Sequence, residues 1–330
     1  MKPHAEAPVR GRLAPSPSGR MHLGNACSSL LAWLSVRAKG GELVLRLEDL
    51  DPDRCRPEYC RQVEEDFRWL GLDWDLGGSR GGSDYFQSQR RAVYEAYLDR
   101  LDREGLLYPC YCSRGELHAA QAPHASDGTA LYPGTCRDLT PAQRAERECR
   151  RRPALRVRVP EETVGFTDGR MGEYEENLAR DCGDFILRRS DGVHGYQLAV
   201  VVDDGLMGIT EVVRGRDLLN STPRQIWLQR KLGFPQPDYY HTPLLTAADG
   251  RRLSKRDADL DLGAIRASGV GPETVVGWLA FRLGLLERWE PVAARELVDS
   301  FAWERVIRSD LVVEENPFAK LFPAQERLIT

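Results

Sequence analysis

A turn between a predicted strand and a predicted helix carries the first residues that could do chemistry. Residues 9–13 predict the strand, prolines end it, and apolar residues three and four apart predict the helix that follows. Because this helix is predicted to begin near residues 21–24, His22 and Asn25 would share one face of its first turn. The amides and the positive dipole end at such a turn favour an anion such as a phosphate. Gly24 would let a flat ring approach the backbone.

A second short stretch offers a lysine for the same anion. Only five of the 46 cationic residues are lysines, and one of them stands in the loop sequence Leu253, Ser254, Lys255 and Arg256. An ammonium on a flexible stem can move onto a phosphate where a planar guanidinium is less suited. By itself each stretch is also explained by an ordinary surface turn or a solvated basic loop, because short motifs recur by chance.

Three cysteines in the middle of the chain have the spacing of a metal site. Cys110 and Cys112 lie two residues apart, and Cys136 follows a segment rich in glycine and proline. Three thiolates need a fourth ligand to close a tetrahedral zinc shell. Chemistry alone ranks Tyr132 last, because a phenol titrates near pH ~10 and must lose its proton to the metal. The candidates ranked above it are His124, His118 and Cys149. The alternative is three unrelated reduced cysteines in a loop. In both cases the cysteines would have a structural role.

The elements that must position these residues alternate between strands and helices. Residues 42–48 predict a buried strand that places Glu48 at its carboxyl end, where ligands bind in open α/β sheets. Further strands are predicted at 155–159, 184–189 (opening a hairpin), 196–202 and 208–214. Helices are predicted at 57–71, 87–107 and 141–152, and from Leu262 to the end of the chain. This order favours a parallel sheet with right-handed crossovers.

Composition limits the classes of protein to be considered. The chain has 330 residues, 42% of them hydrophobic, which predicts two or three domains. No apolar run is long enough to span a membrane, and residues 1–8 lack the apolar core of a signal peptide, so we expect a soluble cytoplasmic protein. Eight scattered cysteines indicate reduced thiols with one metal site. A net charge of −4 means that any RNA contact uses a local patch.

Taken together, the two phosphate-binding stretches resemble the two signatures of class I aminoacyl-tRNA synthetases. His22 to Asn25 is similar to the first signature and Leu253 to Arg256 to the second, in the order and separation of that family. One departure is Asn25, where the class often has histidine, although an amide can still donate to a phosphate. The resemblance covers about residues 9–262. The flanks that narrow it to the glutamyl/glutaminyl branch are residues 14–19, 46–51, 69–75 and 201–204.

The resemblance implies an α/β fold. It consists of a Rossmann-like parallel-sheet nucleotide-binding domain, an inserted zinc-bearing α+β subdomain and a short C-terminal helical region. The catalytic halves are expected at 1–109 and 191–250, the insertion at 110–190, and the second signature with its helices at 251–330. The family pattern after Cys-x-Cys also makes Tyr132 the fourth zinc ligand, beside Cys110, Cys112 and Cys136.

The resemblance also implies a glutamate pocket and an ATP site. Arg214 would hold the side-chain carboxylate in a bidentate fork, Glu48 would accept from the α-ammonium, and Arg12 would lie near the α-carboxylate. Tyr196 would add a hydroxyl donor. Only their family positions raise these arginines above the many expected to be solvated. The glutamate residues are Arg12, Ala14, Ser16, Glu48, Tyr196 and Arg214. ATP with Mg²⁺ is assigned to His22, Gly24, Asn25, Leu253, Ser254 and Lys255, of which His22, Asn25 and Lys255 are the catalytic residues.

The length of the chain after Leu262 indicates which molecule accepts the activated glutamate. The 68 residues after Leu262 have room for a few helices but not for a large anticodon-binding region. Within the branch the chain resembles a truncated paralogue that esterifies glutamate onto queuosine at the wobble base of tRNA(Asp). This implies L-glutamate, ATP and the queuosine-bearing anticodon loop as partners of a monomer, with no membrane partner. The arginines available to neutralise phosphates include those at 144, 147, 150, 151 and 152.

Three other functions are compatible with the same residues. One is an ordinary glutamyl-tRNA synthetase-like enzyme that charges tRNA 3′ ends. Another is a zinc-bearing RNA-binding module with a catalytically dead nucleotide fold, and a third is a small-molecule adenylyltransferase. The dead fold is disfavoured because both signatures keep residues that bind phosphate. Glutamate-dependent exchange of pyrophosphate into ATP without RNA separates most of these functions.

Overall fold

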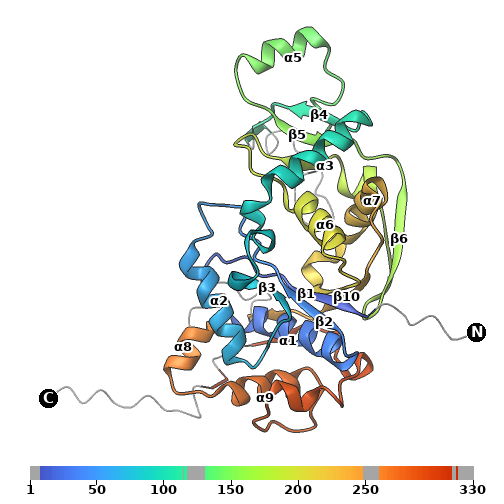
Figure 1. Ribbon diagram of the computed structural model, residues 1–330. Helices are drawn as coiled ribbons and strands as arrows, with labels where there is room; N and C mark the ends of the chain where they lie inside the picture. The colour runs from blue at the N-terminus through green and yellow to red at the C-terminus, as the bar shows by residue number, and fades with distance from the viewer. Residues whose placement is uncertain (1–7, 114, 117–130, 248–259, 314–316, 319–330) are drawn as a thin grey trace, which may run out of the picture. The chain divides into compact units, whose positions relative to one another are not determined.

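The computed structural model describes residues 8–113, 115–116, 131–247, 260–313 and 317–318 (Figure 1). The chain divides into two units. The first unit comprises Met1–Phe86, Thr210–Arg216 and Asp238–Thr330, and the second comprises Gln87–Ile209 and Asp217–Pro237. The sequence predicted an insertion over 110–190 only. The second unit therefore begins earlier and also includes most of the segment assigned to the second catalytic half.

A parallel sheet forms the centre of the first unit. Strands β1 (Arg10–Leu13), β2 (Glu42–Leu45) and β3 (Leu76–Gly77) pair side by side in that order, all parallel. Strands β9 (Glu211–Gly215) and β10 (Asp238–Thr242) form a second parallel pair. The parallel pairing that the alternating pattern predicted is confirmed.

Strand β9 lies directly beside β1. The amide of Thr210 donates to the Arg10 carbonyl at 2.9 Å, and Arg12 Nη1 donates to the Val213 carbonyl at 2.8 Å. Because residue numbers rise together along both strands, β1 and β9 run in the same direction. The carboxyl ends of the strands thus meet at one edge, as the site requires.

The helices of the first unit cover this sheet. Helix α1 (Leu23–Ala38) contacts both β1 and β9 and is buried on most of its faces, from Leu30 through Val36. Helices α2 (Pro57–Trp69), α8 (Leu262–Ala267) and α9 (Pro272–Arg282) also contribute to the apolar core.

The chain after α9 differs from its prediction as continuous helix. Its described part consists of short 3₁₀ turns at Ala294–Leu297 and Trp303–Arg305 and of strand β12 (Leu311–Val312). This strand pairs in parallel with β11 (Leu245–Thr246). Apolar residues at core spacing occur here, but prolines and a glycine interrupt the run, so the helix ends at Arg282.

The second unit is built on antiparallel strands. Strands β4 (Leu107–Cys110), β5 (Ala154–Val157) and β8 (Ile186–Arg188) form one sheet, in that order. Strands β6 (Thr163–Asp168) and β7 (Gly172–Asn177) form a hairpin. The hairpin predicted over 184–192 is present only as β8 and a single bridge from Arg188 to His194.

Helices α3 (Arg91–Arg103), α5 (Pro141–Glu148), α6 (Tyr196–Leu206) and α7 (Thr222–Leu232) complete the second unit. The strand predicted at 196–202 is wrong, because these residues are the first two turns of α6. Its consecutive apolar residues from Leu198 to Val202 are buried in a helix that contacts α7 and α3, but a short continuous apolar run is equally compatible with a buried strand. Helix α5 ends at Glu148, earlier than the predicted Arg152.

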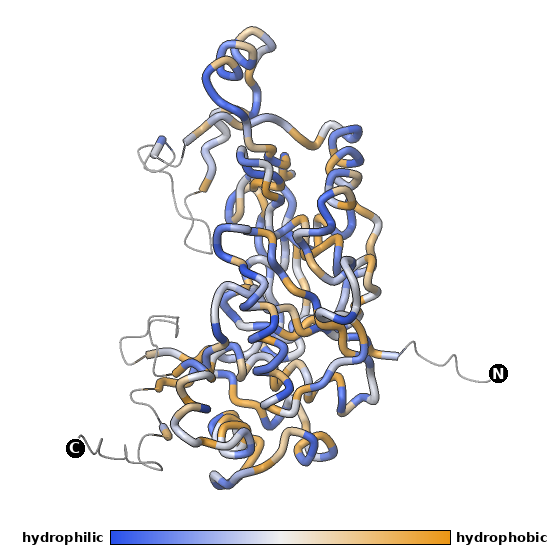
Figure 2. Tube along the Cα trace, turned by 60° about the vertical axis from the view of Figure 1, so that its left-hand side comes forward, coloured by the Kyte–Doolittle hydropathy of each residue, from blue (hydrophilic) through white to orange (hydrophobic). Residues whose placement is uncertain are grey.

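Apolar and polar stretches alternate along the chain at short intervals (Figure 2). Within the described part of the chain, no helix combines the length and the apolar character needed to cross a membrane.

Candidate active site

The first candidate residue, His22, caps helix α1. Its Nδ1 accepts the Gly24 amide at 3.1 Å, and the side chain of Asn25 accepts the His22 amide in return at 3.4 Å. The predicted helix start is therefore confirmed at Leu23, with His22 and Asn25 in contact. Since Nδ1 is an acceptor, the neutral ring carries its proton on Nε2. An Nε2–H donor at a helix N-terminus is suited to a phosphate oxygen.

Gly24 accommodates a flat ring, but that ring is the imidazole of His22. A Cβ atom at residue 24 would lie 3.0 Å from two atoms of the ring and 3.9 Å from Cβ of Leu245. Glycine therefore suits the cap, because a larger residue would require the ring to shift by a few tenths of an ångström. A side chain here would push the ring away from the amide that it accepts.

The carboxyl end of β2 presents Glu48, as the sequence predicted. Beyond β2 the backbone makes one more bridge, from Leu47 to Phe86, and the Glu48 amide then donates to the Pro15 carbonyl at 3.0 Å. The fully buried guanidinium of Arg46 donates to the Glu48 carboxylate at 3.0 Å. Arg46 was not identified from the sequence, although two residues of extended chain place both side chains on one face.

Two buried arginines lie on the neighbouring strands β1 and β9. Arg12 and Arg214 are 5% and 6% exposed, and Arg12 reaches β9 through the Val213 carbonyl. Arg214 Nε donates to Nε2 of His241 at 3.1 Å, and its guanidinium lies 5.4 Å from the ring of Tyr239. His241 is completely buried and stands beside Arg214 in the β9–β10 register. No local sequence pattern identified His241.

The remaining predicted glutamate residues fall in both units. Ala14 is half-buried just after β1, whereas Ser16 is exposed and its carbonyl accepts the Ser18 amide at 2.8 Å. Tyr196 is half-buried at the first residue of α6, in the second unit.

The second signature, with Leu253, Ser254 and Lys255, lies outside the described residues. The chain that follows it returns to the first signature. Asp261 forms an antiparallel bridge with His22, and the Leu262 amide donates to the Met21 carbonyl at 2.8 Å. The start of α8 is thus held against the start of α1.

An acid on α2 supports this contact. Asp66 Oδ2 accepts the Met21 amide at 3.4 Å, and Arg20 Nη1 lies 3.9 Å from Oδ1. Burial raises the pKa of Asp66 to about 6, against the opposing effects of the Met21 amide and Arg20. The Arg20 side chain also passes so close to Gly263 that a Cβ there would lie 2.5 Å from it.

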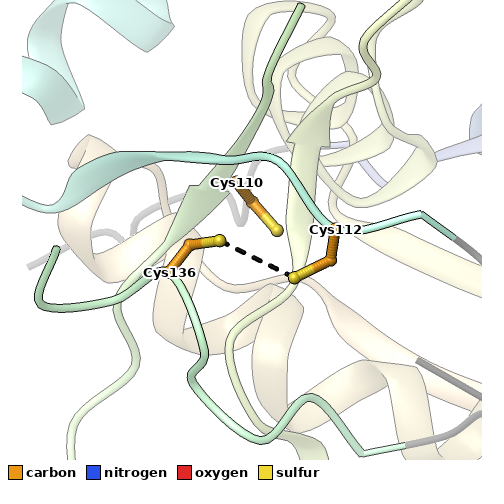
Figure 3. A group of neighbouring side chains, drawn as sticks. All are labelled: Cys110, Cys112 and Cys136. Carbon is orange, nitrogen blue, oxygen red and sulfur yellow. Dashed lines mark hydrogen bonds between the residues drawn. The ribbon is translucent and has the colours of Figure 1, made fainter. Parts of the chain in front are cut away.

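The three predicted cysteines come together in the second unit (Figure 3). Cys110 ends β4, Cys112 follows it, and Cys136 comes from the turn before α5. Their sulfur atoms all lie within 4.8 Å of one another, and those of Cys112 and Cys136 are 3.6 Å apart. None of these cysteines forms a disulfide. The exposed Cys149 is not a member of this cluster.

The hydroxyl of Tyr132 completes a four-atom arrangement. It lies 3.4 Å from Cys110 Sγ and 3.8 Å from Cys112 Sγ, and it accepts the Cys136 amide at 2.7 Å. Ligands of a tetrahedral zinc with metal–sulfur bonds of ~2.3 Å stand ~3.8 Å apart, so these spacings fit a zinc ion. His118 and His124, the ligands that chemistry ranked first, lie outside the described residues.

The protonation of the cluster differs from one thiol to the next. Burial raises the pKa of the Cys112 thiol to about 12, reinforced by the neighbouring Cys110 and Cys136. Burial also acts to raise the pKa of Cys110, but Tyr132 and Arg156 outweigh it and the pKa is lowered. Burial and contact with Cys110 raise the pKa of Tyr132. A metal would have to displace these protons.

A separate cavity of about 530 Å³ opens in the first unit beside β3. Arg68, Trp74, Arg80 and Tyr85 contribute to its lining, together with acidic side chains. None of the predicted site residues is among those that line this cavity.

Comparison with known proteins identifies the class to which this arrangement belongs. The family model for the catalytic domain of class I tRNA synthetases (E and Q) matches residues 8–318. The chain belongs to this family of ATP-dependent ligases.

The names of similar proteins within this class specify a narrower activity. A glutamyl-Q tRNA(Asp) synthetase of Symbiobacterium thermophilum is 51% identical, over 94% of this chain and 98% of that protein. Another, from Nitratidesulfovibrio vulgaris, is 51% identical, over 88% of this chain and 91% of that protein. A glutamate tRNA ligase from Elizabethkingia meningosepticum, solved in complex with its amino acid, has a TM-score of 0.80 at 26% identity. It is matched over 96% of this chain but only 69% of its own.

Proposed function

We propose that this protein activates L-glutamate with ATP, without tRNA, and transfers it to queuosine at the wobble position of tRNA(Asp). The relatives named for that reaction support the proposal, because they are matched over nearly their whole length at 51% identity. The glutamate tRNA ligase structure extends well beyond the matched part.

The proposal that glutamate is the substrate rests on two buried arginines, Arg12 and Arg214, at one end of adjacent parallel strands. A dicarboxylic amino acid needs two separate cations, and rigid guanidinium forks suit carboxylates better than ammonium groups do. Glu48 follows the next strand along and is paired with Arg46, and its carboxylate is proposed to accept from the α-ammonium. Ala14 and Ser16, which follow β1, are further proposed glutamate residues of the first unit, and Tyr196 stays a prediction from its family position.

Activation needs no side-chain nucleophile. The α-carboxylate of glutamate attacks the α-phosphorus of ATP, the bond to the bridging oxygen breaks, and pyrophosphate leaves with its electron pair. His22, Asn25 and Lys255 offset the negative charge that develops on the phosphates, while Gly24, Leu253 and Ser254 shape the site. Mg²⁺ bound to ATP supplies further charge compensation. The contribution of the protein is alignment and electrostatics.

Transfer then moves the glutamyl group from phosphate to an alcohol. A hydroxyl of the cyclopentene diol of queuosine attacks the acyl carbon, loses its proton, and AMP leaves. The arginines on and after α5, at 144, 147, 150, 151 and 152, are proposed to neutralise phosphates of the RNA. Arg150 is already paired with Glu146 at 2.6 Å and is expected to contribute least.

We assign one zinc ion to Cys110, Cys112, Cys136 and Tyr132, with a structural role. The spacing of these donors supports it, and the segment between Cys112 and Cys136 has few apolar residues with which to fold alone. In this role the metal takes no part in adenylate formation.

The decisive experiment for activation is pyrophosphate exchange into ATP with the purified protein and no RNA. Exchange should require L-glutamate and should fail with glutamine or aspartate. Lys255→Ala should reduce exchange steeply and leave unfolding unchanged, whereas Lys231→Ala, a lysine at the end of α7, serves as the matched control. Exchange that proceeds without glutamate, or that Lys255→Ala leaves intact, would contradict the proposed site.

A further inference from the structure

A buried arginine lies against the cysteine cluster without belonging to it. Arg156 on β5 stands opposite Tyr108 on β4 in the antiparallel register, and Cys110 lies two residues further along β4. Because side chains alternate across a strand, Tyr108 and Cys110 face the same side as Arg156. The strand pairing therefore delivers a cation to the cluster.

The guanidinium of Arg156 is stacked on the ring of Tyr132. Its central carbon lies 3.8 Å from the ring centroid, the shortest cation–ring distance among the described residues, and the residue is 6% exposed. Nη1 donates to the Asp184 carbonyl at 2.8 Å, which fixes the plane of the group. Nε is buried with no hydrogen-bond acceptor among the described atoms.

The position of Arg156 affects the charge balance of the cysteine cluster. Three thiolates already exceed the charge of one zinc ion, and a phenolate would leave the centre more negative still, in a buried place. A fixed cation within contact distance of the fourth donor offsets that excess. A second arginine, Arg147, lies on the more exposed helix α5. Its Nη1 is 3.9 Å from Sγ of Cys136.

We propose that Arg156 is a positioning residue for the metal centre, which holds the Tyr132 ring in place and balances the charge of the ligand set. This proposal rests on the zinc assignment above. Residues that orient metal ligands typically change metal affinity 10- to 100-fold when they are replaced. By offsetting the negative charge of a phenolate, Arg156 therefore allows a tyrosine to be the fourth metal ligand, a position that cysteine or histidine ordinarily occupies.

The test compares zinc retention in the full chain. Arg156→Gln removes the charge and the stacking, and Arg156→Lys keeps the charge but loses the planar fork. Arg188→Gln is the matched control, because Arg188 lies in the same sheet, on β8, and is paired with Glu95 at 2.7 Å. Zinc per chain is measured by metal analysis, and the release rate is measured with a chromogenic chelator. Circular dichroism identifies any variant that fails to fold.

We expect wild type and Arg188→Gln to hold one zinc, Arg156→Gln to lose it ~10- to 100-fold faster, and Arg156→Lys to lie between them. If Arg156→Gln misfolds, the release rate of Arg156→Lys decides. Wild-type release rates in both Arg156 variants would overturn the role of Arg156 and leave the zinc site intact. A wild type without zinc, or a Cys136→Ser variant that keeps it, would instead overturn the zinc assignment itself.

Discussion

At the scale of single residues, His22 is both the cap of α1 and the proposed donor to the phosphates of ATP. Two substitutions separate these roles. His22→Asn keeps a good capping side chain, whereas His22→Ala removes it and should cost about 1 kcal/mol of unfolding free energy. Both lose the ring donor, so both should lower the exchange rate by about 100-fold. Urea unfolding and exchange kinetics measure the two effects independently.

Exchange at the wild-type rate in His22→Asn would reduce His22 to a capping residue. An equal loss of stability in both variants would show that the hydrogen bond from the Gly24 amide is not what the ring contributes.

Arg214 tests the glutamate pocket. Arg214→Lys keeps the charge but loses the fork and the Nε contact with His241. Hydrogen bonds to charged groups contribute about 1.5–3 kcal/mol, so the KM for glutamate in exchange should rise about 10- to 150-fold. The KM for ATP should not change. Arg216→Lys is the control, because Arg216 is half-exposed and paired with Asp310. An unchanged KM for glutamate would remove Arg214 from the pocket.

At the scale of elements, α2 supports the contact between α1 and α8 through Asp66, whose charge is costly to bury. Its pKa rises from 3.8 unfolded to about 6 folded, so the folded protein binds more protons between these values. The associated stability is full below the unfolded pKa and is lost as pH rises through about 6. Asp66→Asn mimics the protonated acid and should therefore stabilise the protein more at about pH 8 than at about pH 5.

Urea unfolding of wild type and Asp66→Asn at the two pH values measures this difference. Glu65→Gln, on the exposed face of the same helix, is the matched control and should show no such change. An equal or larger gain at the lower pH would contradict the burial of the charged acid.

Local patterns predicted the elements that carry the first signature, and contacts between distant segments account for what was missed. The strand, turn and helix around His22 follow from prolines and apolar spacing over about 30 residues. Helix α6 was missed because its short run of consecutive apolar residues is compatible with a buried strand as well as with a buried helix. His241 was missed because only the pairing of β9 with β10 places it beside Arg214.

At the scale of the whole molecule, the sequence predicted the family and the parallel sheet correctly, whereas the domain limits stay a prediction. Strand β9 belongs to the first unit although the chain on both sides of it belongs to the second. Such interleaving depends on which strands pair, and composition along the chain does not encode it. The approach of Cys110, Cys112 and Cys136 was predicted correctly because it needs only local spacing and one return of the chain.

The acceptor is the central claim about the whole molecule. The measurement is transfer of labelled glutamate, with ATP, to tRNA(Asp) containing queuosine, to queuosine-free tRNA(Asp) and to tRNA(Glu), followed by nuclease mapping of the label. We predict label only on queuosine-containing tRNA(Asp), in its anticodon fragment, through an ester labile to mild base. Label at the 3′ end of tRNA(Glu), or on queuosine-free tRNA(Asp), would contradict the proposed acceptor and leave only glutamate activation standing.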